Sequence, residues 1–225
     1  MTCALEEGVS LTVEIAGEKL VLFPERGLFW ERGSTLLISD WHIGKADTFR
    51  AAGIGVPDGD LEEELARLES MVQQTAAAEI LVLGDLIHAR DSLRGGAIGR
   101  VGRWIEENGI QISMVTGNHD RSAGVDRTPL AGIDGFGASL ARAPFVFQHE
   151  PEPSEQGYAL AGHLHPVIRM REGKGGGLRA PCFWFGSRVG VLPAFGGFTG
   201  GHGIDPEEGD RVYVLGGGDV IEITA

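Results

Sequence analysis

The sequence predicts an α/β protein: a layered core of alternating strands and helices, followed by a second part made mostly of strands. Two nearly all-apolar runs, 35–39 and 79–83, are typical of strands buried on both faces of a sheet. Between and after these runs, apolar residues recur at the three- and four-residue spacing of amphipathic helices. After residues 110–118 this spacing fades and short apolar runs remain. The order favours a first sheet layered with helices and a second sheet packed on it.

The first elements are short strands and then a helix. Residues 10–24 (SLTVEIAGEKLVLFP) predict two strands joined at Ala16-Gly17, and GLFW at 27–30 continues the β pattern up to the buried run at 35–39. From Asp60, an apolar stripe with acidic residues opposite predicts an amphipathic helix. The stripe consists of Leu61, Leu65, Leu68 and Val72.

The later elements alternate once more and then become strands. After the run at 79–83, a helix containing Val101 and Ile105 is predicted to end at Asn108-Gly109, a typical C-cap pair, before the third buried strand at 110–118. Further strands are predicted within 143–150, 158–166, 167–170, 179–185 and 211–224. EGKGGG at 172–177 predicts a flexible turn and lacks P-loop spacing. Without a linker or repeat, residues 1–225 are expected to form a single domain.

Charge and composition limit the classes of partner. The formal net charge is −13 at pH 7, which disfavours non-specific wrapping of nucleic acid but leaves a phosphate substrate open if the site supplies positive charge. No apolar run approaches the ~20 residues that span a bilayer, and no secretory signal is recognisable. Cys3 and Cys182 are far apart in sequence, so we expect small apolar groups rather than a disulfide, and a reducing cytoplasm.

Polar side chains collect where the predicted strands end. Because α/β proteins bind ligands at the carboxyl ends of strands, we expect these side chains to share one rim. Several buried polar side chains without hydrogen-bond partners would lower the stability of the fold unless a ligand binds them. They are Asp40, His42, Asp85, Asn118, His119, Asp120, His149, His163 and His165.

Carboxylates and imidazoles are the groups that divalent metals bind, and their number here suits two ions. In D-x-H and H-x-H, an extended backbone would put alternate side chains on one face, so that each pair reaches one centre. Asn118 adds a neutral oxygen ligand. With two dications and only Asp40 and Asp85 as carboxylates, the centre stays net positive and attracts a phosphate even on an acidic protein.

Competing catalytic motifs fail. HEPEP at His149 is not the HExxH helix of zinc proteases, because Pro151 and Pro153 forbid that helix. No G-x-S-x-G nucleophile elbow occurs in the chain.

Five blocks in order, SDWHIG, LGDLIH, TGNHD, QHEP and AGHLHP, resemble the calcineurin-like metallophosphoesterase superfamily. Its pattern is D-x-H, G-D, G-N-H-D/E, H and G-H-x-H. FPERGLFW, GKADTFRAAGIGVP, GDLIHAR and LPAFGGFTGG are similar to the bacterial subfamily of ligase-associated DNA-damage-response phosphoesterases, the PdeM type. The resemblance covers most of the chain. It implies a four-layer α-β-β-α sandwich of two mixed β-sheets with two metal ions at its rim.

The resemblance also implies a role for each residue. The implied ligands are Asp40, His42 and His165 for the first ion, Asn118, His149 and His163 for the second, and Asp85 as the bridge. A water shared by the two cations loses a proton near neutral pH, and the resulting hydroxide attacks phosphorus. His119 is the implied general acid, an effect worth ~10²–10⁴-fold in rate. We expect Asp120 to orient its ring.

Neighbouring residues extend or depart from this pattern. His88 stands where many members have an acid or Asn, and is a candidate contact for the substrate phosphate. Lys45 and Arg50 are further phosphate candidates, with solvated loop charges as the alternative. His202, in a Gly-rich stretch, either approaches the site or is a plain loop histidine. Trp41, in the middle of D-x-H, should face away into the core.

The leading interpretation is a metal-dependent phosphodiesterase, an endonuclease acting on DNA in repair; the DNA substrate rests on the subfamily resemblance. The alternatives are a phosphodiesterase or phosphatase for a small nucleotide or other phosphoester, and a non-catalytic scaffold. Mixed nitrogen and oxygen ligands favour Mn²⁺, with Fe or Zn²⁺ as alternatives. The subfamily name suggests a DNA ligase and a helicase as pathway partners; the oligomeric state stays open. Candidates for a nuclease's basic rim are Lys45, Arg50, Arg90, Arg94 and Arg188.

Overall fold

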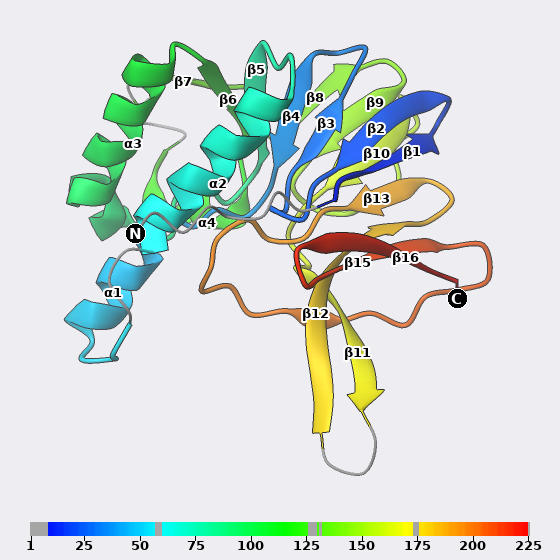
Figure 1. Ribbon diagram of the computed structural model, residues 1–225. Coiled ribbons are helices and arrows are strands. Elements are labelled where there is room, and N and C mark those ends of the chain that lie inside the picture. The colour runs from blue at the N-terminus through cyan, green and yellow to red at the C-terminus, as the bar shows by residue number, and fades with distance from the viewer. Residues whose placement is uncertain (1–8, 57–59, 126–129, 131, 173–175, 225) are drawn as a thin grey trace.

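Two mixed β-sheets packed face to face, with helices on one side, form the body of the molecule (Figure 1). The structure, a computed structural model, describes residues 9–56, 60–125, 130, 132–172 and 176–224. Seven strands form the first sheet in the order β1-β2-β3-β4-β5-β6-β7, and nine strands form the second.

The first sheet joins an antiparallel part to a parallel part. Its strands are β1 (Leu11–Ile15), β2 (Glu18–Leu22), β3 (Leu28–Trp30), β4 (Thr35–Ile38), β5 (Glu79–Leu83), β6 (Gln111–Val115) and β7 (Ile133–Gly135). The hairpin predicted at Ala16-Gly17 is confirmed, with positive φ at both residues. From β4 to β7 the pairing is parallel, so the carboxyl ends of these strands meet at one edge of the sheet.

Alternation along the buried strands explains the layers. Leu36 and Ile38 of β4 pack with residues of α2 (Asp60–Gln74) and α3 (Gly96–Asn108), the two helices predicted from spacing. Leu37, between them, packs instead toward the second sheet. A strand apolar on both faces therefore lies between a helical layer and a sheet, as the run at 35–39 predicted.

The second sheet is built almost entirely from the C-terminal half of the chain. Its strands are β8 (Ser139–Arg142), β9 (Phe145–Gln148), β10 (Tyr158–Ala161), β11 (Pro166–Glu172), β12 (Gly176–Phe185), β13 (Val189–Val191), β14 (His202–Gly203), β15 (Arg211–Gly216) and β16 (Asp219–Thr224). The order is β14-β11-β12-β13-β10-β9-β8, with β15 on β12 and β16 on β15. β9, β10 and β13 run parallel to one another.

Three short helical segments were not predicted: α1 (Lys45–Ala51), the 3₁₀ segment η1 (Arg90–Arg94) and α4 (Asn118–Ala123). Each is too short to show a repeating apolar stripe. The predicted sandwich of two mixed sheets with helices is confirmed. All four α-helices of the described residues precede Gly124, and the described chain after it contributes strands and loops.

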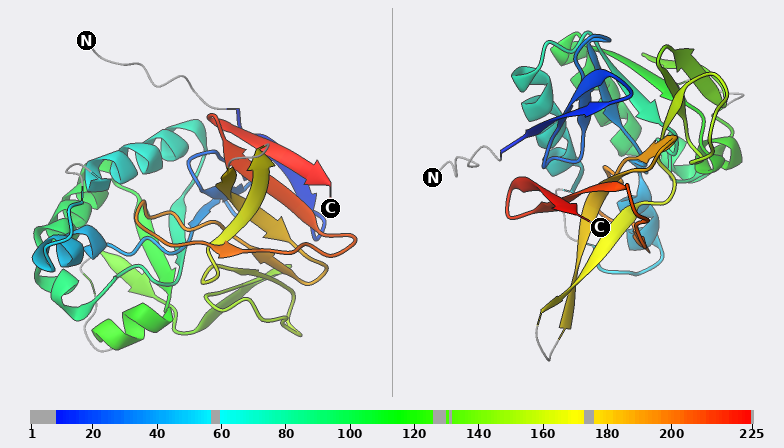
Figure 2. Two further views of the ribbon diagram at one scale, coloured as in Figure 1. Left: turned by 90° about the horizontal axis from the view of Figure 1, so that it is seen from below. Right: turned by 90° about the vertical axis from the view of Figure 1, so that its right-hand side faces the viewer.

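Two segments project from the same end of the sandwich, the long hairpin β11–β12 and helix α1 (Figure 1). The hairpin stands away from the body in a second view as well (Figure 2, right).

Trp41 and Cys182 are buried, as expected, whereas Cys3 and residues 173–175 of the predicted turn lie outside the described residues. Within the described chain, no helix has the length and apolar character needed to cross a bilayer.

Candidate metal centre

The candidate ligands meet at the rim where β4, β5 and β6 end, and the backbone there is unusual. Of the eight non-glycine residues with positive φ in the described chain, five are candidate ligands, with φ between 49° and 70°. These five are Asp40, His42, Asp85, His163 and His165. Such a backbone costs about 1–3 kcal/mol per residue and persists where the surroundings enforce it, often at functional sites.

This backbone corrects one sequence argument. We expected extended segments in which both histidines of H-x-H reach one centre. Instead, left-handed turns separate the two side chains: the ring of His165 lies beside Asp40, whereas the ring of His163 lies beside His149. A period-two argument requires extended φ at every residue, and this segment does not have it.

The first donor group consists of Asp40, His42 and His165, whose ligand atoms lie within 4.8 Å of one another. His165 Nε2 is 3.1 Å from Asp40 Oδ1, and its Nδ1 is 2.9 Å from the carbonyl oxygen of Gly200, which orients the ring. Both ring nitrogens of His42 are buried without a hydrogen-bond partner. Burial lowers the pKa of His42 to about 3, so its ring is neutral and offers a lone pair. An orphaned, neutral imidazole beside a carboxylate fits a metal ligand.

The second donor group converges on Nε2 of His149. That atom lies 2.9 Å from Asn118 Oδ1, 3.1 Å from His163 Nδ1 and 3.4 Å from Asp85 Oδ2. The other nitrogen, Nδ1, donates to the carbonyl oxygen of Leu83 at 3.0 Å. In the neutral ring Nε2 is therefore an acceptor that faces the oxygens of Asn118 and Asp85, an arrangement that suits a bound cation, either a proton or a metal ion.

The pKa of His149 reflects the same crowding. Burial lowers its pKa, but the hydrogen bond to Asp85 and the charges of Asp40 and Asp85 outweigh this, and the pKa lies above its ordinary value. The His149 ring is 2% exposed. The site thus favours positive charge at a position that is almost closed to water.

Asp85 lies between the two groups. Its Oδ1 accepts the backbone N–H of His119 at 2.8 Å, and its Oδ2 faces His149. Burial raises the pKa of Asp85, but the interactions with His149, the N–H of His119 and the charge of His42 outweigh this and lower it, keeping the carboxylate ionised. Ligand atoms of Asp40, Asp85 and His149 also lie within 4.8 Å of one another, so the two carboxylates link the donor groups.

The glycines of the sequence blocks make room for ligands from other blocks. A Cβ on Gly117 would overlap the carboxylate of Asp85, and one on Gly162 would overlap that of Asp40. Glycine is therefore needed before Asn118 and His163 because another ligand occupies the space of a side chain.

A buried support behind the first group was missed in the sequence. Glu64 of α2 is 7% exposed; it accepts the indole N–H of Trp41 at 2.8 Å and the backbone N–H of Gly197 at 2.7 Å. Burial raises its pKa above the usual value. Glu64 thus ties the segment that carries Asp40 and His42 to the loop around residues 193–199. The one signal in the sequence is that Glu64, an acid, lies three residues after Leu61, on the apolar side of α2.

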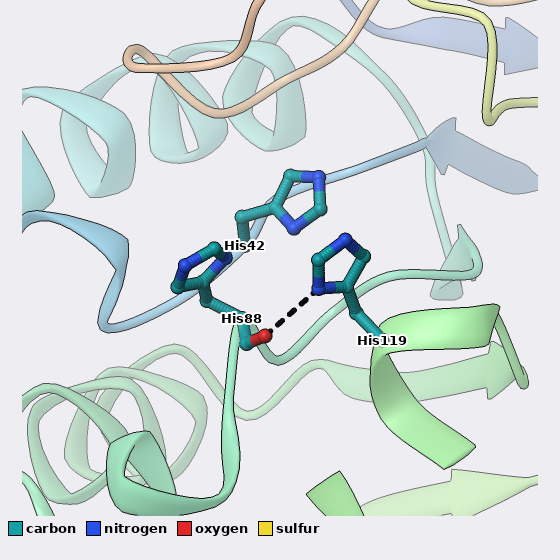
Figure 3. A group of neighbouring side chains, drawn as sticks. All are labelled: His42, His88 and His119. Carbon is teal, nitrogen blue, oxygen red and sulfur yellow. Dashed lines mark hydrogen bonds between the residues drawn. The ribbon is translucent and has the colours of Figure 1, made fainter. Parts of the chain in front are cut away.

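A histidine cluster flanks the centre (Figure 3). The rings of His88 and His119 are stacked, with centroids 5.4 Å apart and an interplanar angle of 22°. Ligand nitrogens of His42, His88 and His119 lie within 4.8 Å of one another. His119 Nδ1 donates to the carbonyl oxygen of His88 at 2.9 Å, which leaves Nε2 for other partners. Nδ1 of His88 is buried without a hydrogen-bond partner.

Asp120 corrects a second expectation. Its carboxylate does not touch the His119 ring; it accepts the backbone N–H groups of Ile87 and Gly117, both at 2.9 Å. The ring of His119 is instead oriented by a backbone carbonyl. Asp120 is wholly buried and fixes the loop after β5 to the start of α4, so its role is structural.

The predicted phosphate-binding cations differ in their surroundings. Lys45, with His42, lines a groove of about 470 Å³ beside the centre, which Arg50 also lines. Burial lowers the pKa of Lys45, partly offset by the charges of Asp40 and Asp85. Arg50 is ion-paired with Asp47 at 3.0 Å and Asp60 at 3.1 Å, so a phosphate would compete with two carboxylates.

Three other expected arginines and His202 lie around the rim or beyond it. Arg188 is paired with Glu155 at 2.9 Å, and Arg90 and Arg94 are exposed on η1. The backbone N–H of His202 donates to the carbonyl oxygen of His165 at 3.0 Å, which places this exposed histidine next to the first donor group.

Comparison with known families gives this geometry a context. The family model of calcineurin-like phosphoesterases matches residues 33–174, which include all the candidate ligands. The chain belongs to the calcineurin-like phosphoesterase family. As a calcineurin-like phosphoesterase it is a metal-dependent hydrolase, in agreement with its buried groups of histidine and aspartate.

Solved structures similar to this calcineurin-like phosphoesterase include the crystal structure of Pseudomonas putida nuclease MPE. That match has a TM-score of 0.83 and 34% sequence identity, and covers 96% of this chain and 100% of the nuclease. Yfce, a phosphoesterase from E. coli, matches with a TM-score of 0.41 and 18% identity over 81% of this chain and 88% of its own. No curated protein matches the sequence significantly.

Proposed function

We propose that this phosphoesterase is a DNA endonuclease that cleaves phosphodiester bonds with two divalent cations, Mn²⁺ foremost. The observation that carries the chemistry is the convergence of two donor groups on Asp40 and Asp85 beside the histidine cluster. The nucleic-acid substrate is supported by the likeness to the Pseudomonas putida nuclease over nearly the whole chain. A repair role with a ligase and a helicase belongs to the same proposal and rests on the subfamily resemblance of the sequence.

In this proposal each donor group holds one ion. Asp40, His42 and His165 hold the first, Asn118, His149 and His163 the second, and Asp85 faces both. Bound there, two divalent cations supply Lewis acidity and lower the pKa of a coordinated water. The mixture of imidazole, carboxylate and amide ligands suits Mn²⁺, and also accepts Fe or Zn²⁺.

The chain itself handles the leaving group. With Nδ1 of His119 fixed by the carbonyl of His88, Nε2 is the nitrogen from which a protonated ring can donate to the departing oxygen. His88, whose ring stacks on that of His119, is placed to contact a phosphoryl oxygen in this proposal. Lys45 adds a cation at the same side of the centre.

Both sheets contribute to this one site, so we propose that residues 1–225 act as a single domain.

A small phosphoester is the second candidate substrate. The groove beside His42 and Lys45 has a volume of about 470 Å³, within the range of small-ligand sites. A nucleotide in that groove would place its phosphate near the centre without any flanking strand.

One substrate panel separates these candidates. The chelator-stripped protein is reloaded with Mn²⁺ and assayed on bis(4-nitrophenyl) phosphate, the matching monoester, single-stranded DNA, and nicked or gapped duplex. The proposal expects cleavage of DNA at low salt and preference for the diester over the monoester. Turnover of the nitrophenyl diester with no cutting of any DNA would instead support a small phosphoester. Full activity of the chelator-stripped protein before Mn²⁺ is added would contradict a metal-dependent mechanism.

A further inference from the structure

Seven arginines in the described residues have a carboxylate partner, in a chain of net charge −13. The ion-paired arginines are Arg32, Arg50, Arg100, Arg121, Arg142, Arg188 and Arg211. Arg169 and Arg179 are among the exposed arginines without an ion-pair partner in the described chain, and they are the two that lie opposite each other in a strand pair. These two guanidinium groups are the starting point of the inference.

The two arginines face each other across the projecting hairpin. Arg169 of β11 and Arg179 of β12 are direct partners in the antiparallel register. Like charges directly opposite each other destabilise a strand pair, whereas opposite charges stabilise it. An anion bound between them would remove this repulsion, so the register favours a site for negative charge.

A glycine-rich segment connects this pair to the metal centre. The Arg179 guanidinium donates to the carbonyl oxygen of Gly201, and Nε of Arg169 lies 3.6 Å from where a Cβ on Gly203 would be. The preceding carbonyl, that of Gly200, accepts the hydrogen bond from His165 Nδ1. His165 is itself directly followed by β11. Both arginines are thus held on the same segment that orients a candidate ligand.

The hairpin and α1 define the two sides of the rim. Both project from the same end of the sandwich (Figure 1), and each directly follows candidate ligands in the chain: α1 comes after His42, and β11 comes after His165. Lys45, at the start of α1, is on the other side and has no ion-pair partner in the described residues. A strand crossing the centre would therefore meet a lysine on one side and the arginine pair on the other.

We propose that Arg169 and Arg179 bind a backbone phosphate of the nucleic-acid strand next to the cleaved bond, on the hairpin side of the metal centre. This rests on the proposed nuclease function and assigns the path of the substrate. Guanidinium groups bind phosphate through paired N–H donors, which a lysine cannot reproduce. The small nitrophenyl diester has no flanking phosphate and cannot use this site.

The test compares the double variant Arg169→Ala/Arg179→Ala with the wild-type protein, both loaded with Mn²⁺. KM for a single-stranded oligonucleotide should rise roughly tenfold or more, because charged hydrogen bonds to a phosphate are lost. The slope of log KM against log salt should become shallower by about 0.7 for each phosphate contact removed. The rise in KM should be much larger for the oligonucleotide than for bis(4-nitrophenyl) phosphate.

Two further variants make the test specific. Arg169→Lys/Arg179→Lys keeps both charges but loses the paired donors. Its salt slope should be close to that of the wild-type protein, whereas its KM should stay above the wild-type value. Lys19→Ala removes a cation that also lacks an ion-pair partner in the described residues, but on β2 of the other sheet. It should leave KM for the oligonucleotide unchanged.

Several results would overturn the inference. These are an unchanged KM and salt slope in the double variant, an equal rise in KM for the small diester, or an equal effect of Lys19→Ala. In each of these cases wild-type cleavage of DNA would still stand. If the wild-type protein turns over only the small diester, the proposed function fails, and this inference fails with it.

Discussion

Two regions of one rim have opposite physical characters. The candidate metal centre is largely buried and held by its backbone: Asp40 and His149 are almost completely buried, His163 is exposed at its edge, and most of the ligands have left-handed backbone. The projecting segments beside it carry cations without ion-pair partners in the described chain, namely Lys45, Arg169 and Arg179. Buried contacts are strong and insensitive to salt, whereas exposed charges are weak and screened.

The contrast assigns different tasks to the two regions. A buried group of ligands acts on any phosphoester that reaches it, so its loss should affect all substrates equally. Exposed cations matter only for a substrate that extends beyond the reacting phosphate. Substitutions should therefore separate into those that abolish the chemistry and those that change only the handling of a polymer.

The largest effect is expected for Asp85→Ala. This removes the carboxylate between the donor groups, and with it several kcal/mol of metal-based stabilisation of the transition state. The rate on both the nitrophenyl diester and DNA should fall by at least ~10³-fold. Metal content, measured by plasma mass spectrometry, should fall too. Asp134→Ala, an exposed aspartate on β7, is the matched control and should retain both metal and rate. Full metal content in Asp85→Ala would contradict the role of Asp85 as a ligand of the buried centre.

His119→Ala should come next and should depend on the leaving group. Cleavage of DNA should fall by ~10²–10⁴-fold, because an alkoxide leaving group needs a proton. Hydrolysis of the nitrophenyl diester should fall far less, since nitrophenolate leaves without one. Metal content should be unchanged. Equal losses on the two substrates would argue against a general acid at His119.

Glu64→Ala tests the support behind the centre. It leaves the indole N–H of Trp41 and the backbone N–H of Gly197 without an acceptor, at a cost of about 1–3 kcal/mol each. The midpoint of thermal unfolding should drop, and the Mn²⁺ concentration needed for half-maximal rate should rise. Glu63→Ala changes an exposed neighbour on α2 and should do neither. A stable Glu64→Ala protein with wild-type affinity for Mn²⁺ would show that the hydrogen bonds of Glu64 do not support metal binding.

The smallest effects should distinguish two cations of α1. Lys45→Ala should raise KM for single-stranded DNA a few-fold and reduce its salt dependence by about 0.7 in slope. Arg50→Ala should change KM little, because Asp47 and Asp60 already neutralise that side chain. Steady-state kinetics over a range of NaCl concentrations would show the difference. Identical salt slopes in the two variants would mean that ion pairing does not decide which cation meets the substrate.

Much of the centre could be predicted from the sequence because ligand identity and strand ends are local properties. The carboxyl ends of β4, β5 and β6 are marked by buried runs followed at once by Asp40, Asp85 and Asn118. Parallel pairing then brings them together whatever the loops do. Trp41, expected in the core from its place between Asp40 and His42, is buried.

What could not be predicted depends on contacts between distant segments. Asp120 was expected to orient His119, but a carboxylate next to a helix start has backbone N–H groups closer at hand. The arginine pair is a matter of register, which fixes Arg169 opposite Arg179 only once β11 and β12 are aligned. Glu64 appears in the sequence as one acid of a charged helix, and only packing shows its partners.

The central claim is that these donors hold two cations at fixed positions. Anomalous difference maps from crystals grown with Mn²⁺, recorded at the manganese absorption edge, test it most directly. We expect two peaks, one between His42 and His165 and the other between Asn118 and His163, with Asp85 in contact with both. A single peak, or manganese located away from these side chains, would contradict the account.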